Sequence, residues 1–390
     1  MDAAVPPRSN VDLFSDEMLT DPFPTYRELR DMGPVVYMEP LGAYALSRYA
    51  DLRRALREWE TFSSAEGIGF NDLMNMSLKG TILATDPPEH TAQRTVMLER
   101  LNLREVRGLT ADVEEKADAL VSGLVERGSF DAVTDLARAF PARVAGELIG
   151  LAPDVLDRVV DAGDASFTVV GPLNDRTMAG FDTVLAVLET MACLEKEDLA
   201  PGSMGRDIVD AADRGDIPKE MGFQLIWNYT GPAFDTTINA ITSLVWLLGT
   251  HPDQWAELRA DRSLIPAAVN EVLRIESPIQ TWGRLCRVDA DVDGVRIPAG
   301  ERVVLLLGSG NRDERHYAEP DRFDIHRNPA DHLAFGHGIH LCVGAGLSRL
   351  EIESVLGALV KHVTRFELGE PVRRLNNTVR GFSRLPLTVS

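Results

Sequence analysis

The stretch from about Lys219 to Gly249 most constrains the fold, because it is as long as a long helix and apolar on most of its faces. A helix that is apolar all round belongs at the centre of a large core. A chain of 390 residues can build such a core. Further helices are predicted around this one, at Thr25–Met32, Tyr49–Trp59, from Pro87 onward, within residues 110–200, at Ser263–Ile275 and at Val343–Val363.

Strands are expected in a smaller part of the chain. Short apolar runs predict them at Val35–Met38, Tyr44–Ser47, Val295–Ile297, Val303–Leu307 and in the tail. Residues 63–80 are predicted to form a long loop, and residues 311–341 are irregular and polar. The pattern therefore predicts a mainly α fold with a small β-rich region, in a single large domain over residues 1–390 with residues 1–20 as an N-terminal arm.

The net charge of −20 excludes a nucleic-acid-binding function, since phosphates require a basic face. The first residues lack the basic region and apolar run of a signal peptide, and no stretch of about 18 apolar residues is present to span a bilayer. The three cysteines, Cys193, Cys286 and Cys342, are too few and too scattered for a disulfide scaffold. We therefore expect a cytoplasmic protein without a membrane partner.

Cys342 lies just before the last predicted helix, in the run Phe335-Gly336-His337-Gly338-Ile339-His340-Leu341-Cys342-Val343-Gly344. A helix N-terminus carries partial positive charge and free N–H groups, which lower the pKa of a thiol. Gly338 and Gly344 leave room for the backbone to approach a bulky planar group. A thiolate held in this way can ligate haem iron and favour cleavage of the O–O bond.

Two other interpretations of Cys342 are possible from the residues alone. A free cysteine in a glycine-rich turn is most often a buried structural residue. A zinc site is the other alternative, with His337 and His340 as further ligands.

The run from Phe335 to Gly344 resembles the haem-binding signature of the cytochrome P450 family, Phe-x-x-Gly-x-x-x-Cys-x-Gly. The resemblance extends from about Asp21 to Leu387. It implies the family's fold, haem b as cofactor and Cys342 as the ligand of the iron, with Phe335 and Gly336 in the haem-binding loop. It also implies a monooxygenase that inserts one atom of dioxygen into a C–H bond, by hydroxylation or O-demethylation.

The Glu-x-x-Arg pair formed by Glu271 and Arg274 shares one helix face, because residues three apart are neighbours there. Alone, such a pair is more often a solvated surface pair. In the family it is joined by an arginine from a later irregular segment, and the resemblance assigns that position to Arg322.

Haem propionates are two carboxylates, which would need cations as partners. His90 and Arg94 lie four residues apart on one predicted helix face, in Asp86-Pro87-Pro88-Glu89-His90-Thr91-Ala92-Gln93-Arg94. The resemblance assigns propionate binding to these two residues, to Arg284 and to His340. Each of the four, taken singly, is more often an ordinary surface or capping residue.

The central helix contains Gly231-Pro232-Ala233-Phe234-Asp235-Thr236-Thr237. The plain interpretation is that both threonine hydroxyls bond back to the preceding turn. The resemblance assigns proton delivery to Asp235 and Thr236, and haem contact to Ala233. Pro232 departs from the family pattern. It cannot donate to the carbonyl of Asn228, so we expect a kink there.

The chain most resembles the bacterial branch that oxidises para-substituted benzoic acids, through Ser277–Thr281, Asn376–Gly381 and Gly171–Asn174. Glu66 stands where that branch has one carboxylate-binding arginine, and Trp227 where it has another. We therefore predict a neutral or weakly basic, compact aromatic or terpenoid substrate, unless Glu66 points to solvent. The predicted pocket residues are Ile68, Phe70, Phe167, Val170, Thr230, Ala233, Phe234, Ile279, Trp282 and Phe382.

The chain has no flavin or nucleotide domain of its own, so the resemblance implies electrons from an iron–sulfur ferredoxin and its NAD(P)H-dependent reductase. Arg349 and Lys361 are predicted to assist docking on the Cys342 face. The alternatives are a peroxygenase that uses hydrogen peroxide directly and a non-catalytic haem sensor or carrier.

Overall fold

The computed structural model describes residues 4–390. The 30-residue helix α13 (Met221–Thr250) crosses the middle of the molecule, as its apolar sequence predicts. Pro232 lies inside this helix, which continues through it. The helix packs against α8, α10, α12, α15 and α17. The predicted mainly α fold with a small β-rich region is confirmed.

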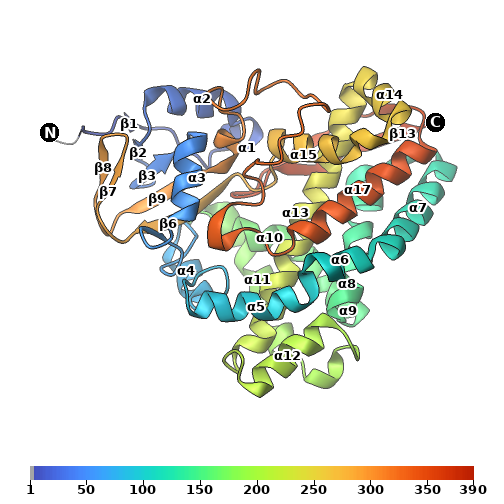
Figure 1. Ribbon diagram of the computed structural model, residues 1–390, viewed down its shortest axis with the longest axis horizontal. Helices are drawn as coiled ribbons and strands as arrows, with labels where there is room; N and C mark the ends of the chain where they lie inside the picture. The colour runs from blue at the N-terminus through green and yellow to red at the C-terminus, as the bar shows by residue number, and fades with distance from the viewer. Residues whose placement is uncertain (1–3) are drawn as a thin grey trace.

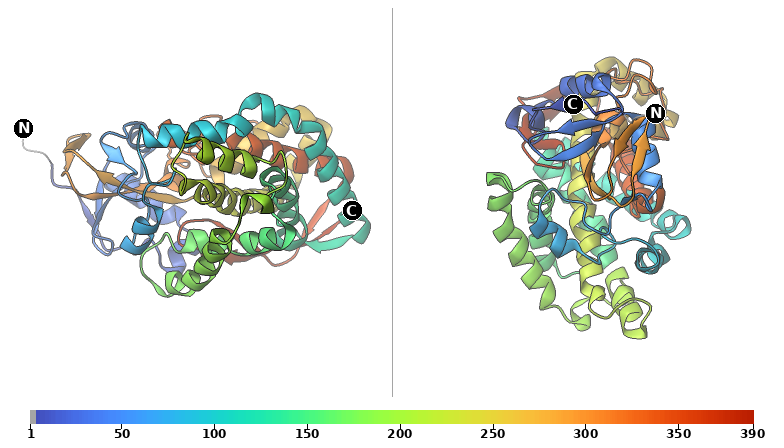
Figure 2. Two further views of the ribbon diagram at one scale, coloured as in Figure 1. Left: turned by 90° about the horizontal axis from the view of Figure 1, so that it is seen from below. Right: turned by 90° about the vertical axis from the view of Figure 1, so that its left-hand side faces the viewer.

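Most of the helices surround α13, whereas α1, α2 and α3 lie beside the six-stranded sheet (Figures 1 and 2). The longer ones are α2 (Phe23–Met32), α3 (Tyr49–Arg57), α5 (Glu89–Leu101), α7 (Thr110–Arg127), α8 (Ala139–Ile149), α9 (Pro153–Asp161), α11 (Asp175–Ala192), α12 (Met204–Arg214), α14 (Pro252–Ala260), α15 (Ile265–Ile275) and α17 (Ala345–His362). The shorter ones are α1 (Asp16–Thr20), α4 (Asp72–Leu78), α6 (Leu103–Gly108), α10 (Gly163–Thr168), α16 (Leu307–Gly310), a π-helix (Ala132–Ala137) and 3-10 turns at Lys196–Asp198, Arg262–Leu264 and Gly338–His340.

The six-stranded sheet lies at one end of the molecule, in the order β1-β2-β3-β9-β6-β4. Its strands are β1 (Arg8–Ser9), β2 (Val36–Met38), β3 (Ala43–Leu46), β4 (Phe62–Ser63), β6 (Thr281–Cys286) and β9 (Arg302–Leu306). Strand β6 was not predicted. It pairs antiparallel with β9 and β4, so it carries Trp282 and Arg284 toward the centre of the molecule.

Three smaller sheets are formed mainly by the later part of the chain. β10 (Phe366–Leu368), β13 (Pro386–Val389) and β5 (Ser129–Asp131) form one sheet, and two hairpins consist of β11 (Val372–Arg374) with β12 (Gly381–Arg384), and β7 (Ala290–Val292) with β8 (Val295–Ile297). The tail therefore packs beside the middle of the chain.

Two predictions differ from the structure. The expected loop at residues 63–80 contains α4, whose first turn is capped by the Asn71 side chain. The expected arm at residues 1–20 is partly folded, because β1 pairs with β2 and Met18 is buried; the first three residues of that arm lie outside the described residues. No helix in the described part of the chain combines the length and apolarity needed to cross a bilayer.

Candidate active site

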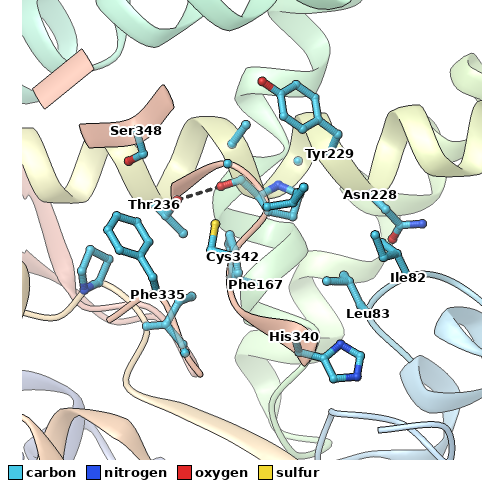
Figure 3. Close-up of a pocket in the computed structure, with 18 of the residues that line it drawn as sticks. Ile82, Leu83, Phe167, Asn228, Tyr229, Thr236, Phe335, His340, Cys342 and Ser348 are labelled. Atoms are coloured by element: carbon cyan, nitrogen blue, oxygen red, sulfur yellow. Dashed lines mark hydrogen bonds between the residues drawn. The ribbon is translucent and has the colours of Figure 1, made fainter. Parts of the chain in front are cut away.

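The Cys342 loop is held by the backbone. The N–H of Cys342 donates to the carbonyl of Phe335 at 2.8 Å, and the backbone at Gly336 and Gly338 is left-handed, with φ of 71° and 73°. A Cβ on Gly338 would lie 2.3 Å from the carbonyl oxygen of Leu56, so only glycine fits there. The loop thus turns the Cys342 side chain toward a cavity, into which its sulfur is exposed (Figure 3).

Two opposing influences act on the Cys342 thiol. Burial raises its pKa, whereas the N–H of Gly344 and the guanidinium groups of Arg94 and Arg349 lower it. Burial dominates, so the net direction is upward, contrary to the lowering expected from the helix N-terminus alone. The lowering contributions favour the thiolate, which is the form that binds a metal.

The cavity lies between α13, the Cys342 loop, α5 and the residues around β6. Most of the predicted pocket residues line it, together with the predicted haem-loop residues: Ile68, Phe167, Val170, Ala233, Ile279, Trp282, Phe335 and Gly336. Residues that the sequence did not single out complete the wall, namely Met74, Leu78, Ile82, Leu83, Val184, Asn228 and Pro278.

Four predicted pocket residues lie outside the cavity. Phe70 packs on Phe14, with ring centroids 5.3 Å apart, and Phe382 packs on Trp246 at 5.6 Å. Thr230 and Phe234 lie on a face of α13 turned into the protein core, where the Thr230 hydroxyl donates to the carbonyl of Ile226. For Thr230 and Phe234 the reason is that α13 is apolar on most faces, so its sequence does not mark the side that meets the cavity.

His90, His340, Arg94 and Arg284 converge on the cavity from three separate segments. The rings of His90 and His340 have centroids 4.4 Å apart. Within residues 4–390, the buried Nε2 atom of each ring has no hydrogen-bond partner. Burial lowers the pKa of His90 to about 4 and that of His340 to about 2, so both rings are neutral N–H donors near pH 7.

Arg284 contributes a buried cation to the same group. Its Nη1 atom donates to the carbonyl of Gly283 at 2.7 Å, and burial lowers its pKa to about 10. Arg284 is buried and Arg94 half-buried, and together with the two unpartnered histidine nitrogens they favour an anionic ligand. A haem, with its two carboxylates, is such a ligand, so these residues fit the expected cofactor.

Asp235 does not face the cavity. Its carboxylate accepts from Arg374 at 2.9 Å and from the Asn239 amide at 3.1 Å. Burial raises the pKa of Asp235, while Arg374 opposes the shift. Arg374 also contacts Asp164 at 3.3 Å, which ties α10 and β11 to the central helix. Asp235, to which the resemblance assigns proton delivery, therefore does not line the cavity in this structure.

Thr236 does line the cavity, and its hydroxyl donates to the carbonyl of Pro232 at 2.8 Å (Figure 3). Thr236 thus bonds back to the preceding helical turn, as the sequence allowed without any functional role. Thr237 differs, because its hydroxyl contacts that of Ser348 on α17 at 3.2 Å. The lone pairs of the Thr236 oxygen remain able to accept a hydrogen bond.

The buried ion pair of Glu271 and Arg274 is present at 2.7 Å, with both side chains inaccessible to solvent. Its predicted third member, Arg322, is wrong: the Arg322 side chain is exposed and contacts Glu319 at 3.1 Å. Arg327 takes that place instead, with its Nε atom 3.2 Å from Glu271. Arg322 contributes only its main-chain carbonyl, which accepts from Arg274.

Glu66 does not contribute charge to the cavity. Its side chain is exposed and lies 3.8 Å from Lys79, so it points to solvent. Arg302 holds the loop by donating to the carbonyl oxygens of Glu66 and Gly67. The like-charge argument from Glu66 is therefore wrong, and the charge of the substrate is decided by the residues that line the cavity.

Glu351 on α17 lines the cavity and was not singled out from the sequence. Burial raises its pKa well above the usual value for a carboxyl group, and its Oε1 atom lacks a partner within residues 4–390. Burial also raises the pKa of Tyr229, and the charge of Glu351 adds to that shift. The only sequence signal for Glu351 as a cavity residue is that it follows Cys342 by nine residues, on the helix that begins just after the Cys342 loop.

Comparisons with known proteins agree with this geometry. The Cytochrome P450 family model matches residues 223–388. Cytochrome p450 CYP199A2 of Rhodopseudomonas palustris is 36% identical, over 98% of this chain and 95% of that protein. Beta-dihydromenaquinone-9 omega-hydroxylase of Mycobacterium tuberculosis is 33% identical, over 98% and 79%. The structure of Mycobacterium marinum cytochrome P450 CYP268A2 in complex with pseudoionone has a TM-score of 0.89 at 28% identity, over 99% of this chain and 100% of that chain.

Proposed function

Because this chain belongs to the cytochrome P450 family and is a haem-dependent monooxygenase, we propose that Cys342 is the axial ligand of its haem b iron. The observation that carries the proposal is the Cys342 sulfur facing a cavity whose wall also holds four potential propionate partners. When bound, the haem supplies the activation of dioxygen from which one oxygen atom enters a substrate C–H bond.

His90, Arg94, Arg284 and His340 are proposed to hold the two propionates. Phe335 and Gly336 of the Cys342 loop and Ala233 of α13 line the same cavity and would contact the haem. These assignments account for the unpartnered Nε2 atoms of both histidines. They also explain why two cations line a largely apolar cavity.

Thr236 is proposed to position water for proton delivery, because its oxygen lines the cavity with lone pairs free to accept. Asp235 lies one residue away and is proposed to supply the proton once it separates from Arg374. Protons would then reach the cavity in steps that depend on breaking this ion pair.

The substrate is proposed to be a neutral or weakly basic, compact aromatic or terpenoid molecule. Among the described residues, the only Lys or Arg side chains that line the cavity are Arg94 and Arg284, which are assigned to the propionates. The 36% identity to CYP199A2 supports the resemblance to the benzoic-acid branch, but this cavity provides no further cation for a carboxylate. We expect 4-methoxybenzoate to produce little Soret shift, and tight binding of that anion would contradict the proposed substrate class.

The electron donor is proposed to be an iron–sulfur ferredoxin with its NAD(P)H-dependent reductase. Of the two predicted docking residues, Arg349 stacks over Phe335 at 4.6 Å, and Lys361 is paired with Asp118 at 2.8 Å. Arg349 therefore contacts the Cys342 loop directly. The charge of Lys361 is already neutralised by its ion pair with Asp118, so Lys361 is less available to a docking partner.

The test is product formation by the haem-loaded enzyme in two parallel assays. The proposal expects turnover with NAD(P)H, ferredoxin, reductase and dioxygen, and little with hydrogen peroxide alone. Turnover driven by peroxide without ferredoxin would favour the peroxygenase, and ligand binding without NAD(P)H consumption would favour the sensor or carrier.

A further inference from the structure

We propose that Asn228 selects the substrate by accepting a hydrogen bond from a neutral donor, such as the O–H of a phenol or alcohol or the N–H of an amide. This inference rests on the proposed function and adds a specificity-determining residue to it. Asn228 is buried and lines the cavity two turns before Thr236 on α13 (Figure 3).

The orientation of the Asn228 amide is fixed by the turn that precedes it. Its Nδ2 atom donates to the carbonyl oxygen of Gln224 at 2.8 Å. A carbonyl can only accept, so the NH₂ group must face Gln224. The amide oxygen, Oδ1, is thereby left as an acceptor on the cavity side.

Pro232 adds a second acceptor at the same residue. The carbonyl oxygen of Asn228 would ordinarily receive the N–H of the residue four positions later, but that residue is Pro232, which has no N–H. Two oxygen atoms of Asn228 are therefore without their usual helical or amide donors.

Two hydroxyl groups that line the same cavity have their hydrogens engaged. Ser166 donates to the carbonyl of Ala162 at 2.7 Å, and Thr236 donates to that of Pro232 at 2.8 Å. Both line the cavity and can offer only lone pairs to a ligand. At Asn228, Ser166 and Thr236 an anion would meet only acceptors, whereas a neutral O–H or N–H group would find partners there.

The spacing along α13 limits the length of the substrate. Asn228 precedes Ala233 by five residues and Thr236 by eight, which corresponds to about 7.5 Å and about 12 Å along the helix axis. A donor bound at Asn228 would then stand roughly 7 to 12 Å from the carbon beside the haem, by the same rise per residue. A single ring with a donor at one end and an alkyl or alkoxy group at the other has this reach.

The experiment compares two ligands that differ only in the donor, 4-ethoxyphenol and 1-ethoxy-4-methoxybenzene. Each is titrated into the haem-loaded protein, and the Kd is read from the Soret shift. We expect the phenol to bind about 3- to 10-fold more tightly, the range for one net hydrogen bond. Equal affinities, or binding of neither compound, would overturn the inference.

Two variants of Asn228 separate the acceptor from the volume of the side chain. Asn228→Leu should abolish the preference for the phenol while leaving the ether within about 2-fold, because it removes the side-chain acceptor and keeps the shape. Asn228→Ser should keep part of the preference, since a serine hydroxyl bonded to Gln224 still exposes lone pairs. The control Met74→Leu, on an apolar part of the same cavity, should leave the preference unchanged.

A preference for the phenol that survives in Asn228→Leu would also overturn the role of Asn228. The carbon-monoxide spectrum of each reduced sample separates this failure from failure of the proposed function. Protein with an intact thiolate-type spectrum but no donor preference contradicts only the inference about Asn228. Protein without that spectrum contradicts the haem-thiolate proposal itself.

Discussion

The imidazole rings of His90 and His340 lie with centroids 4.4 Å apart, and the Nε2 atom of each is buried without a partner in the described structure. One histidine comes from α5 and the other from the 3-10 turn before Cys342, so residues 250 positions apart present donors to one place. Such an arrangement is costly unless an acceptor joins it.

Replacing either histidine by Phe should therefore loosen the haem. We expect His90→Phe and His340→Phe each to accelerate haem transfer to excess apomyoglobin by about 10- to 150-fold, since a hydrogen bond to a charged group contributes about 1.5 to 3 kcal/mol. His337→Phe is the matched control, because His337 lies in the same loop but does not line the cavity. Equal transfer rates in all three variants would contradict the propionate assignment.

The contact of Arg327, and not Arg322, with the buried Glu271 should be measurable in the free energy of unfolding. Arg327→Ala should lower the free energy of unfolding by about 1 to 3 kcal/mol, because it removes a charged partner from the buried Glu271. Arg322→Ala should change it by less than about 0.5 kcal/mol, as expected for an exposed residue. Denaturant unfolding of both variants would check this, and a larger loss in Arg322→Ala would reverse the assignment.

Thr236 and Thr237 form a matched pair for the proton-delivery proposal. Thr236→Val should reduce product formation roughly 10²-fold, with the consumed NAD(P)H appearing as hydrogen peroxide, because the oxygen that positions water is removed. Thr237→Val, which removes only the contact with Ser348, should retain product formation within a few-fold. Peroxide yield per NAD(P)H is the measurement, and undiminished coupling in Thr236→Val would rule out its role.

Glu351 should make stability depend on pH. Burial raises its folded-state pKa, so this group's contribution is fully present below the unfolded pKa, about 4.3, and is lost as pH rises toward the folded value. Glu351→Gln stays neutral at every pH. Its free energy of unfolding should therefore rise relative to wild type by about 1.4 kcal/mol per pH unit through that window.

Denaturant unfolding of the haem-loaded protein between pH 5 and about 8 would measure this difference. Exposed Glu115→Gln is the control and should give a constant difference from wild type. A constant difference for Glu351→Gln as well would mean that Glu351 ionises normally in the folded protein.

Helices and the Cys342 loop could be predicted because their signals are local. The apolar run that became α13 and the glycines around Cys342 determine structure within a few residues of themselves. Strand β6 was missed because it lacks an alternating apolar pattern. Its buried positions are Thr281, Gly283, Arg284 and Cys286, of which Thr281 and Arg284 are polar. Its place between β9 and β4 comes from tertiary pairing, which no local pattern encodes.

Side-chain directions were the least predictable part of the site. Arg322 and Arg327 lie five residues apart in an irregular segment, which has no periodicity to indicate which one turns inward. Asp235 and Thr236 are neighbours, yet one faces Arg374 and the other the cavity, as the rotation between successive helical residues requires. Arg374, the partner of Asp235, lies on the distant strand β11, so the sequence around α13 could not indicate this contact.

The central claim, a bond between the Cys342 sulfur and haem iron, is tested most directly by the carbon-monoxide difference spectrum of reduced, purified protein. Wild type and the control Cys193→Ser, whose cysteine is exposed at the end of α11, should give the long-wavelength Soret band of a thiolate-ligated haem. Cys342→Ser should lack that band. Colourless wild-type protein, or an unchanged band in Cys342→Ser, would contradict the account.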